Sequence, residues 1–365
     1  MGPSLSPRGE GFLKLPLPSG ERDGVRGLRA SVQGGGADVE GRCPFPSRRG
    51  APKNRRMVLR LGTRGSPLAL AQAAEVRARL AAAHPTLAAP DAVVIVPIRT
   101  TGDRVTQGSL AELGGKGLFT KEIEEALRAG TIDLAVHSLK DMETALPPGL
   151  AIAAFLPRED PRDALIAASG CTAIAALPRG AIVGTASIRR KAQLLHARPD
   201  LKVVPLRGNV GTRLQKLAAG EVDATVLAVA GLKRIGRTDC VSCVLAAEEM
   251  LPAVGQGVIA VEARADDARM RMLLAAIDDS ATAACATAER AMLAALDGSC
   301  RTPIAGYARL EGERFVLDAM VIRPDGGTLH RTRREGGADD AYALGTDAGA
   351  ELKSRAGAGF FEAAS

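Results

Sequence analysis

Two pairs of arginines stand where the sequence predicts that helices begin. Arg189 and Arg190 follow one short polar turn, and Arg207 and Arg213 flank another. Arginines in the first turn of a helix oppose its dipole, so helix stability does not explain them. Guanidinium groups bind carboxylates bidentately, and several together indicate a ligand that carries several carboxylates. The alternative is that these arginines are exposed and paired with surface acids.

A carboxylate stands close behind the apolar run Ile132–Val136. Asp141 lies there beside Lys140. A carboxylate next to a lysine, with arginines near in space, would be held ionised and could stabilise a developing positive charge. Asp141 is therefore the candidate proton-handling residue, although a Lys-Asp pair after a strand is more usually a surface turn. His137 fits a structural role better than a catalytic one.

Two further turns could bind an anion. Arg64 and Ser66 precede Pro67 at the start of a predicted helix, whose free N–H groups favour negative charge. A capped turn between a strand and a helix is the alternative interpretation. The Gly-rich run around Lys116 lacks the spacing GxxxxGK[ST] of a phosphate loop, so it indicates a mobile loop over a cleft, with Phe119 beside it.

The elements that must position these residues alternate along the chain. Short apolar runs interleaved with amphipathic helices predict α/β domains with mainly parallel sheets, whose ligands gather at strand ends and helix N-termini. The helix after Ser66 has an expected apolar stripe of Leu68, Leu70, Ala71, Val76 and Leu80. Strands are expected at Val58–Leu61, Ala92–Ile98, Ile132–Val136, Leu150–Phe155, Ala164–Ala167, Ile182–Gly184, Lys202–Leu206, Asp223–Leu227 and Val258–Glu262, and helices at Thr120–Ala129, Ile188–Ala197 and Val210–Ala219.

The last part of the chain has a different pattern. A long Ala-rich helix near Ala281–Leu296 precedes alternating strands near Ile304–Leu310 and Arg314–Ile322, and then a final helix. We expect a separate α+β domain there.

Composition narrows the class of protein. Residues 1–56 hold 11 basic and 5 acidic residues, which leaves 37 and 36 in the remainder, so the net charge of +7 lies mainly in this segment. With aromatic residues at 2% and no Trp, a nucleic-acid partner is not expected. No apolar run is long enough to span a membrane, no signal peptide is evident, and the six cysteines are dispersed. We expect a cytoplasmic protein without disulfides, and no metal site, because Cys240 and Cys243 lack a second ligand pair.

Residues 1–56 are rich in Gly, Pro, Ser and Arg and lack sustained periodicity. This composition predicts a disordered extension ahead of a start at Met57. A transit peptide is the alternative, but five acidic residues count against it.

Nine segments together resemble the successive signature segments of the porphobilinogen deaminases (hydroxymethylbilane synthases). They are LGTRGSPLALAQA, GGKGLFTKEIE, DLAVHSLKD, REDPRDALI, GTASIRR, LRGNVGTRL, AVAGLKRIG, LPAVGQG and DGSCRTPIAGYA. The resemblance implies two domains like those of periplasmic binding proteins, at 57–157 with a return segment 256–277 and at 158–255. A third domain, 278–365, would carry a cysteine that binds the cofactor.

The resemblance also implies a chemistry and its residues. A dipyrromethane cofactor would be bound covalently to Cys300, and Asp141 would be the catalytic aspartate. The reaction implied is loss of ammonia from porphobilinogen, attack of the free α-carbon of the terminal pyrrole on the resulting azafulvene, and release of hydroxymethylbilane after four additions, by a monomer that needs no metal or nucleotide. The cleft around the cofactor and the growing oligopyrrole would be lined by Arg64, Ser66, Lys116, Ser138, Lys140, Thr185, Ser187, Arg189, Arg190, Arg207, Arg213 and Arg234.

Two positions depart from the family pattern. Ser299 stands where the family often has Gly, and because Gly reaches conformations that Ser avoids, we expect the serine to restrict the backbone of the cysteine loop. Glu112 stands where the family often has a basic residue. A periplasmic binding protein would share the two-domain cleft. It would need an export signal, however, and would have no use for a covalent thiol in a third domain.

Overall fold

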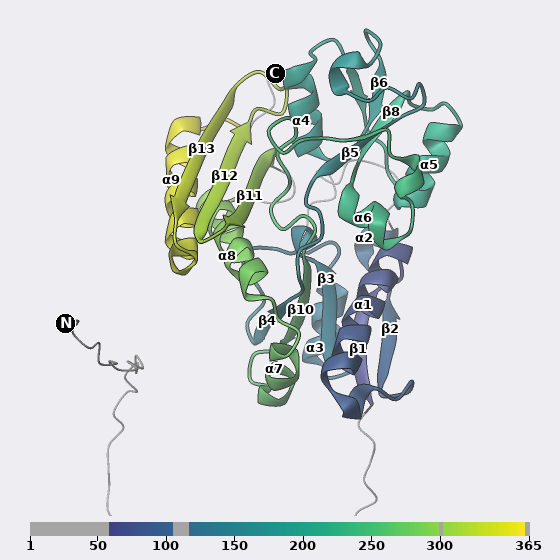
Figure 1. Cartoon of the computed structure of the whole chain (residues 1–365), viewed down its shortest axis with the longest axis vertical. Helices are drawn as coiled ribbons and strands as arrows, with labels where there is room; N and C mark the ends of the chain where they lie inside the picture. Colours follow the sequence, from purple (N-terminus) through teal and green to yellow (C-terminus); the bar gives the residue numbers. More distant parts are fainter. Residues whose placement is uncertain (1–57, 105–116, 299–301, 362–365) are drawn as a thin grey trace, which may run out of the picture. The chain divides into compact units, whose positions relative to one another are not determined.

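The computed structural model describes residues 58–104, 117–298 and 302–361 (Figure 1). They belong to a compact unit that spans Arg55–Ser365. The described strands form two five-stranded sheets and one three-stranded sheet. None of the helices in these ranges combines the length and apolar character needed to cross a membrane.

The first sheet has the strand order β2-β1-β3-β10-β4. β1 pairs in parallel with β2 and β3, whereas β10 runs antiparallel to both of its neighbours. Helices cover both faces: Val76 and Leu80 of α1 pack in the core on one side, and Ile123 of α3 packs on the other. The elements are β1 (Leu59–Arg64), α1 (Pro67–Ala83), β2 (Val93–Ile98), α2 (Thr101–Arg104), α3 (Lys121–Arg128), β3 (Leu134–Ser138), β4 (Leu150–Phe155), β10 (Ile259–Arg264) and α7 (Ala268–Ala275).

The second sheet repeats this topology with the order β7-β6-β8-β5-β9. Its strand β5 is antiparallel to both neighbours, and β6 pairs in parallel with β7 and β8. Leu194 of α4 packs on one face, and Leu214 of α5 packs on the other. The elements are β5 (Asp163–Ala167), β6 (Ile182–Gly184), α4 (Ile188–Ala197), β7 (Lys202–Val204), α5 (Val210–Ala218), β8 (Ala224–Ala228), α6 (Val229–Arg234) and β9 (Cys243–Val244).

The chain crosses between these two sheets twice. It leaves the first sheet after β4 and enters the second as β5, and it returns as β10. In each sheet the first strand after a crossing is the one that runs against the others. The parallel strands β1, β3, β6 and β8 therefore end where the crossing segments lie.

The third sheet is antiparallel, in the order β11-β12-β13, and α9 lies along one face of it (Figure 1). Helices α8 and α9 approach closely at two glycines. A Cβ at Gly345 would lie 2.1 Å from the carbonyl oxygen of Ala288, and one at Gly349 would lie 2.6 Å from that of Met292. The elements are α8 (Ser280–Ala295), β11 (Ile304–Glu311), β12 (Arg314–Ile322), β13 (Leu329–Gly336) and α9 (Ala341–Ala356).

A buried ion pair joins the crossing segments to this third part. Arg158 of the first crossing donates to Glu289 of α8 at 2.5 Å. The Glu289 carboxylate also accepts from the backbone N–H of Gly255, on the second crossing, at 2.6 Å. It accepts from the N–H of Ala308 on β11 at 2.8 Å. One carboxylate thus connects both crossings with the third sheet.

The expected fold class is confirmed: two α/β parts, each with a mainly parallel sheet, precede a C-terminal α+β part. Strand β13 was not expected, and neither were β9 and the short helices α6 and α7. The stripe expected on α1 is partly wrong, because Leu68 and Leu70 are only half-buried, while Ala69 and Ala73 form the buried face with Val76 and Leu80. The domain boundaries stay a prediction, although β10 does pair within the first sheet.

Candidate active site

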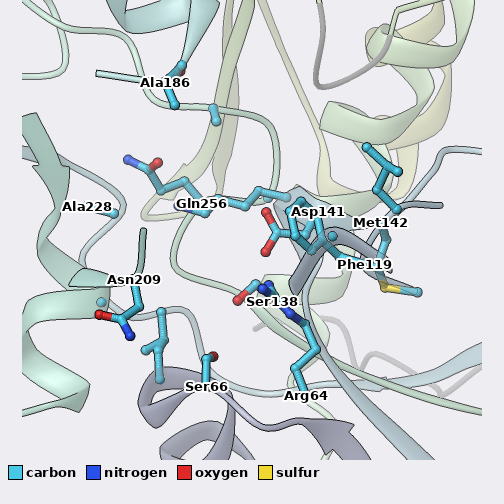
Figure 2. Close-up of a pocket in the computed structure, with 18 of the residues that line it drawn as sticks. Arg64, Ser66, Phe119, Ser138, Asp141, Met142, Ala186, Asn209, Ala228 and Gln256 are labelled. Carbon is cyan, nitrogen blue, oxygen red and sulfur yellow. The ribbon is translucent and has the colours of Figure 1, made fainter. Parts of the chain in front are cut away.

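A cavity of about 1660 Å³ lies where the parallel strands of both sheets end. Figure 2 shows the Asp141 carboxylate pointing into it, with Phe119, Ser138 and Arg64 on one side and Asn209 and Ala228 on another. Residues from α8 and the start of β11 complete the wall. Of the residues expected to line a cleft, the cavity brings together Arg64, Ser66, Ser138, Lys140, Asp141, Ser187, Arg189, Arg190, Arg207, Arg213 and Arg234.

Asp141 and Lys140 enter the cavity on a single helical turn that follows β3. The buried Leu139 anchors this turn, and its backbone N–H donates to the carbonyl of Val258 at 3.0 Å. Burial, together with the positive charge of Arg190, lowers the pKa of Lys140 to about 8, although Asp141 acts in the opposite direction. This pKa lies close to neutral pH, so the amine loses its proton more readily than an ordinary lysine does. A bound anion would favour the charged form.

Arg189 and Arg190 share one buried carboxylate. Nη2 of each donates to Asp163, at 2.7 and 2.8 Å. Gln256, on the second crossing, donates to the same carboxylate at 2.8 Å. Each arginine also donates to a backbone carbonyl, that of Leu251 or of Val226. The two arginines are therefore neither exposed nor paired with surface acids. They are buried, fixed in orientation and adjacent to the cavity.

The turn before α5 presents another pair of cations. Gly208 has φ of +114°, and a Cβ there would lie 2.7 Å from Thr212, so the turn between Arg207 and Arg213 requires glycine. Asn209 caps the helix by accepting from the N–H of Thr212 at 2.9 Å. Burial and the charges of Arg190 and Arg207 lower the pKa of Arg213 to about 10.

This donor set fits an anionic ligand. Lys140 and Arg213 both have lowered pKa values because they are buried near other cations. Such an arrangement is unfavourable in the free protein and becomes favourable when carboxylates bind among these groups. The cavity therefore matches a ligand with several carboxylates, such as a dipyrromethane or an oligopyrrole.

Arg64 and Arg234 reach the cavity from its edges, and each is held by an acid. Arg64 donates to Asp103 at 2.5 Å and lies 4.2 Å over the ring of Phe119. Arg234 of α6 donates to Glu75 of α1 at 3.2 Å. This contact joins a helix of the second sheet to a helix of the first. These acids orient the guanidinium groups and partly neutralise them.

The expected hydroxyl residues serve mainly as caps. Ser66 accepts from the N–H of Ala69, and Ser187 accepts from the N–H of Arg190. Ser138 instead bonds with the Gln72 amide, at 2.8 Å. Thr185 is buried, accepts from the N–H of Ser187 and is not among the residues that line the cavity.

Several residues singled out in the sequence either fall outside the described ranges or do not line the cavity. Lys116, Cys300, Ser299 and Glu112 fall in ranges that the structure does not describe. His137 is buried and lies 3.2 Å from Glu262, which suits a structural residue.

Sequence reasoning missed several polar residues of the site. Asp163 begins a buried apolar strand, and its charge alone was a signal that a partner was needed. Gln256 lies in the segment LPAVGQG, which carries the family resemblance but gave no indication of a role for this side chain. Gln72, Asp103 and Lys216 also line the cavity or orient residues there. Gln72 lies in the segment LGTRGSPLALAQA, but nothing in that segment indicated its contact with Ser138, and Asp103 and Lys216 stand in none of the segments that resemble the family.

The fold and the cavity together define an α/β protein with a cation-lined cavity between two sheets that fits an acidic ligand, and with a further α+β part beside the cavity. Residues 59–272 match the family model described as "Porphobilinogen deaminase, dipyromethane cofactor binding domain". Residues 283–354 match that described as "Porphobilinogen deaminase, C-terminal domain". The chain belongs to the porphobilinogen deaminase family, and residues 59–272 match the family's dipyrromethane-binding domain.

Curated relatives agree with this assignment. The chain is 56% identical over 301 residues to the porphobilinogen deaminase of Nitrobacter hamburgensis, which covers 82% of this chain and 94% of that protein. It is 57% identical over 304 residues to that of Paracoccus denitrificans, which covers 83% and 96%.

Solved structures of low similarity include a VFT2 domain of Bordetella pertussis BvgS, at 16% identity and a TM-score of 0.38, over 61% of this chain and 87% of that one. Another is a TRAP periplasmic solute binding protein from Pseudomonas aeruginosa, at 14% identity and a TM-score of 0.35, over 60% and 82%. Such distant likenesses carry no functional information.

Proposed function

We propose that this chain condenses four porphobilinogen molecules head to tail, releasing one ammonia for each, and then hydrolyses the product to hydroxymethylbilane. It would thus be a transferase of tetrapyrrole biosynthesis. The observation that carries the proposal is the cavity in which Asp141 stands among buried cations, in a chain that belongs to the porphobilinogen deaminase family. Porphobilinogen carries an acetate and a propionate, so each added unit brings two carboxylates that need cationic partners.

The arginines and Lys140 bind these carboxylates. Arg207 and Arg213 line the cavity from one turn, and Arg190 is fixed nearby by Asp163. A guanidinium that is already oriented loses little entropy when it binds a carboxylate, so Asp163 increases the affinity that Arg190 contributes. Lys140 adds a point charge whose protonated form the ligand stabilises.

Asp141 acts on the substrate that reacts. When ammonia leaves the aminomethyl group of porphobilinogen, the positive charge that remains is shared with the pyrrole nitrogen. The Asp141 carboxylate, which points into the cavity, would stabilise that charge (Figure 2). The free α-carbon of the terminal pyrrole then forms a bond to the methylene carbon that ammonia has left, and the proton on that α-carbon is released.

The cofactor would be a dipyrromethane attached to Cys300, and when bound it supplies the terminal pyrrole whose free α-carbon receives the first substrate unit. The described residues fit it, because the pKa values of Lys140 and Arg213 are lowered by desolvation and by neighbouring cations, and bound carboxylates would offset both effects. Arg189, Arg190, Arg207, Arg213 and Lys140 would hold its carboxylates. The surrounding cleft would be shaped by Arg64, Ser66, Ser138, Lys116, Ser187 and Arg234, and Thr185 would act on it only through its contact with Ser187.

The intact mass of the purified chain tests this function directly. The wild-type protein should carry the added mass of two linked pyrroles, should consume porphobilinogen and should release ammonia. Cys300→Ser should lose the added mass and, because the bound group stabilises the folded state, should melt at a lower temperature. An active wild-type protein without added mass would contradict the cofactor, and a protein that ignores porphobilinogen would contradict the function.

We also propose that the chain works in the cytoplasm as a monomer, without a nucleic-acid or membrane partner. The near balance of charge after residue 56 and the scarcity of aromatic residues support the absence of a nucleic-acid partner. Light scattering after gel filtration tests the monomer, and fractionation of cells tests the location. Retention on heparin after removal of residues 1–56 would contradict the absence of a nucleic-acid partner.

A further inference from the structure

Arg290 of α8 contacts the loop that directly follows Asp141. Its Nη2 donates to the backbone carbonyls of Glu143 and Thr144, both at 2.9 Å. These residues lie nearly 150 positions earlier in the chain, so the contact joins the helix of the third part to the turn that carries Asp141.

The same face of α8 makes a second contact with this turn. Ala286, one helical turn before Arg290, packs in a buried cluster with Leu139 and Met142, the residues that flank Lys140 and Asp141. Residues four positions apart lie on one side of a helix. Ala286 therefore supports the turn itself, and Arg290 holds the segment immediately after it.

Few other contacts restrain the loop of residues 142–145 that follows Asp141. Residues 142–145 belong to no helix or strand, so their carbonyls have no partners in a ladder. The Glu143 side chain accepts from the backbone N–H of Gly117 at 3.2 Å, and the N–H of Met142 donates to Leu139 within the turn. A charged donor that bonds to two adjacent carbonyls is a stronger restraint than either contact.

The Arg290 side chain is half-buried. Burial lowers its pKa, although the charges of Glu262 and Glu143 oppose this effect. A partly buried guanidinium pays a desolvation free energy, and its two hydrogen bonds to backbone carbonyls offset this cost only while both remain in place. The loop and the helix are therefore coupled, and neither shifts without a loss of these bonds.

We propose that Arg290 is a positioning residue for Asp141, which fixes the loop after it so that the carboxylate keeps its place in the cavity. The inference rests on the proposed function, in which Asp141 stabilises the positive charge on the reacting substrate. Arg290 is not among the residues that line the cavity, so its effect on the reaction passes through the loop.

The test compares Arg290→Leu and Arg290→Lys with a matched control. Arg264 is the control, because its Nη1 also donates to two backbone carbonyls, those of Leu127 and Ile132, at 3.0 and 3.1 Å, and it does not line the cavity. The three variants, Arg290→Leu, Arg290→Lys and Arg264→Leu, are purified, and their cofactor content is measured by intact mass. Melting temperature, kcat and KM for porphobilinogen, and hydrogen exchange of a peptide that covers residues 140–146 are then compared.

We expect kcat of cofactor-loaded Arg290→Leu to fall roughly tenfold to a hundredfold while KM changes little, since a displacement of about 1 Å at a catalytic group has effects of this size. Exchange in residues 140–146 should become faster. Arg290→Lys, which keeps a charged donor with different geometry, should lie between this variant and the wild type. Arg264→Leu should lower the melting temperature without changing kcat or the exchange of this peptide.

A cofactor-loaded Arg290→Leu protein with normal kcat and normal exchange would overturn the proposal. An equal loss of kcat in Arg264→Leu would also overturn it, because the effect would then be general. If Arg290→Leu does not fold, the same two measurements on Arg290→Lys decide. A wild-type protein that lacks covalent pyrroles or does not consume porphobilinogen would instead refute the proposed function, and the two failures are therefore distinct.

Discussion

Asp141 and Lys140 are adjacent in sequence, but the cavity gives them opposite tasks. Asp141 would act on a charge that develops only as ammonia leaves, whereas Lys140 would bind carboxylates that are charged throughout. Only the first interaction is stronger in the transition state than in the ground state, so only it accelerates the chemical step.

Replacement of Asp141 by Asn keeps the size of the side chain and removes its charge. We expect Asp141→Asn to keep the fold and to lower kcat at least about a hundredfold, with a much smaller change in KM. Asp141→Glu, which keeps the charge at altered reach, should fall between. Steady-state kinetics on protein of known cofactor content is the measurement, and near-normal kcat in a loaded Asp141→Asn protein would refute the role.

Lys140 should make ligand binding depend on pH. Its pKa in the free cavity is about 8, and the charged form binds carboxylates. Affinity for an anion should therefore be complete below this pH and decline as the pH rises through it. Titration calorimetry of porphobilinogen with cofactor-free Cys300→Ser checks this. The added change Lys140→Arg should move the decline to higher pH, and an unchanged decline would assign it to another group.

At the scale of elements, the start of β5 and the start of α4 meet at one carboxylate. Asp163 is fully buried, and both Arg189 and Arg190 hold its pKa well below the usual range. Two helical guanidinium groups are thereby joined to the strand that follows the first crossing. Their place in the cavity depends on Asp163 as much as on the helix that carries them.

Asp163→Asn should destabilise the protein by about 3–5 kcal/mol, because the variant leaves buried charges without their counter-ion. Since the folded-state pKa of Asp163 is depressed, its contribution is complete above the unfolded pKa of about 3.9 and is lost as the pH falls below that value. Urea unfolding at several pH values should show a wild-type advantage that is constant above about pH 4 and smaller below it.

The matched control is Glu335→Gln, which removes a carboxylate from exposed pairs with Arg314 and Arg333. It should cost no more than about 1 kcal/mol. A similar cost for both variants would show that the buried pair contributes nothing special.

The elements show which parts of the fold could be predicted from the sequence. Buried parallel strands such as β3 and β8 are continuous apolar runs, and their helices have polar faces, so both were predicted to within a few residues. Strand β13 was not predicted because it is an edge strand with four charged side chains, and burial alternates along it. The place of β10 within the first sheet is set by contacts far apart in sequence, and only the family resemblance indicated it.

The same distinction holds for the site. Arg190, Arg207 and Asp141 stand in turns or at helix starts that follow strands, where local pattern is informative. The residues that contact them or their neighbours, such as Asp163, Gln256 and Arg290, are separated from them by tens of residues or more. Local pattern contains no information on such pairs, and for this reason the roles of these partners became visible only in the structure.

At the scale of the whole molecule, the described fold begins at β1, and the family match begins at residue 59. A chain that starts at Met57 should therefore be folded and fully active, because every residue assigned to the site lies after it. Its melting temperature, cofactor mass and kcat should equal those of the full chain. A clear loss of activity in the shorter chain would assign a role to residues 1–56.

The insertion of β10 between β3 and β4 also governs the order in which the protein can fold as it is synthesised. The second sheet is built entirely from Asp163–Val244, but the first sheet lacks a central strand until the ribosome has added Ile259–Arg264. At the usual rate of translation, β4 waits roughly 5–20 s for that partner. During this interval β3 and β4 expose apolar edges to which a chaperone or another nascent chain could bind. A chain that ends at Val258 should accordingly protect residues 163–244 from protease and leave 58–155 sensitive, and the opposite pattern would show that the first sheet forms without its last strand.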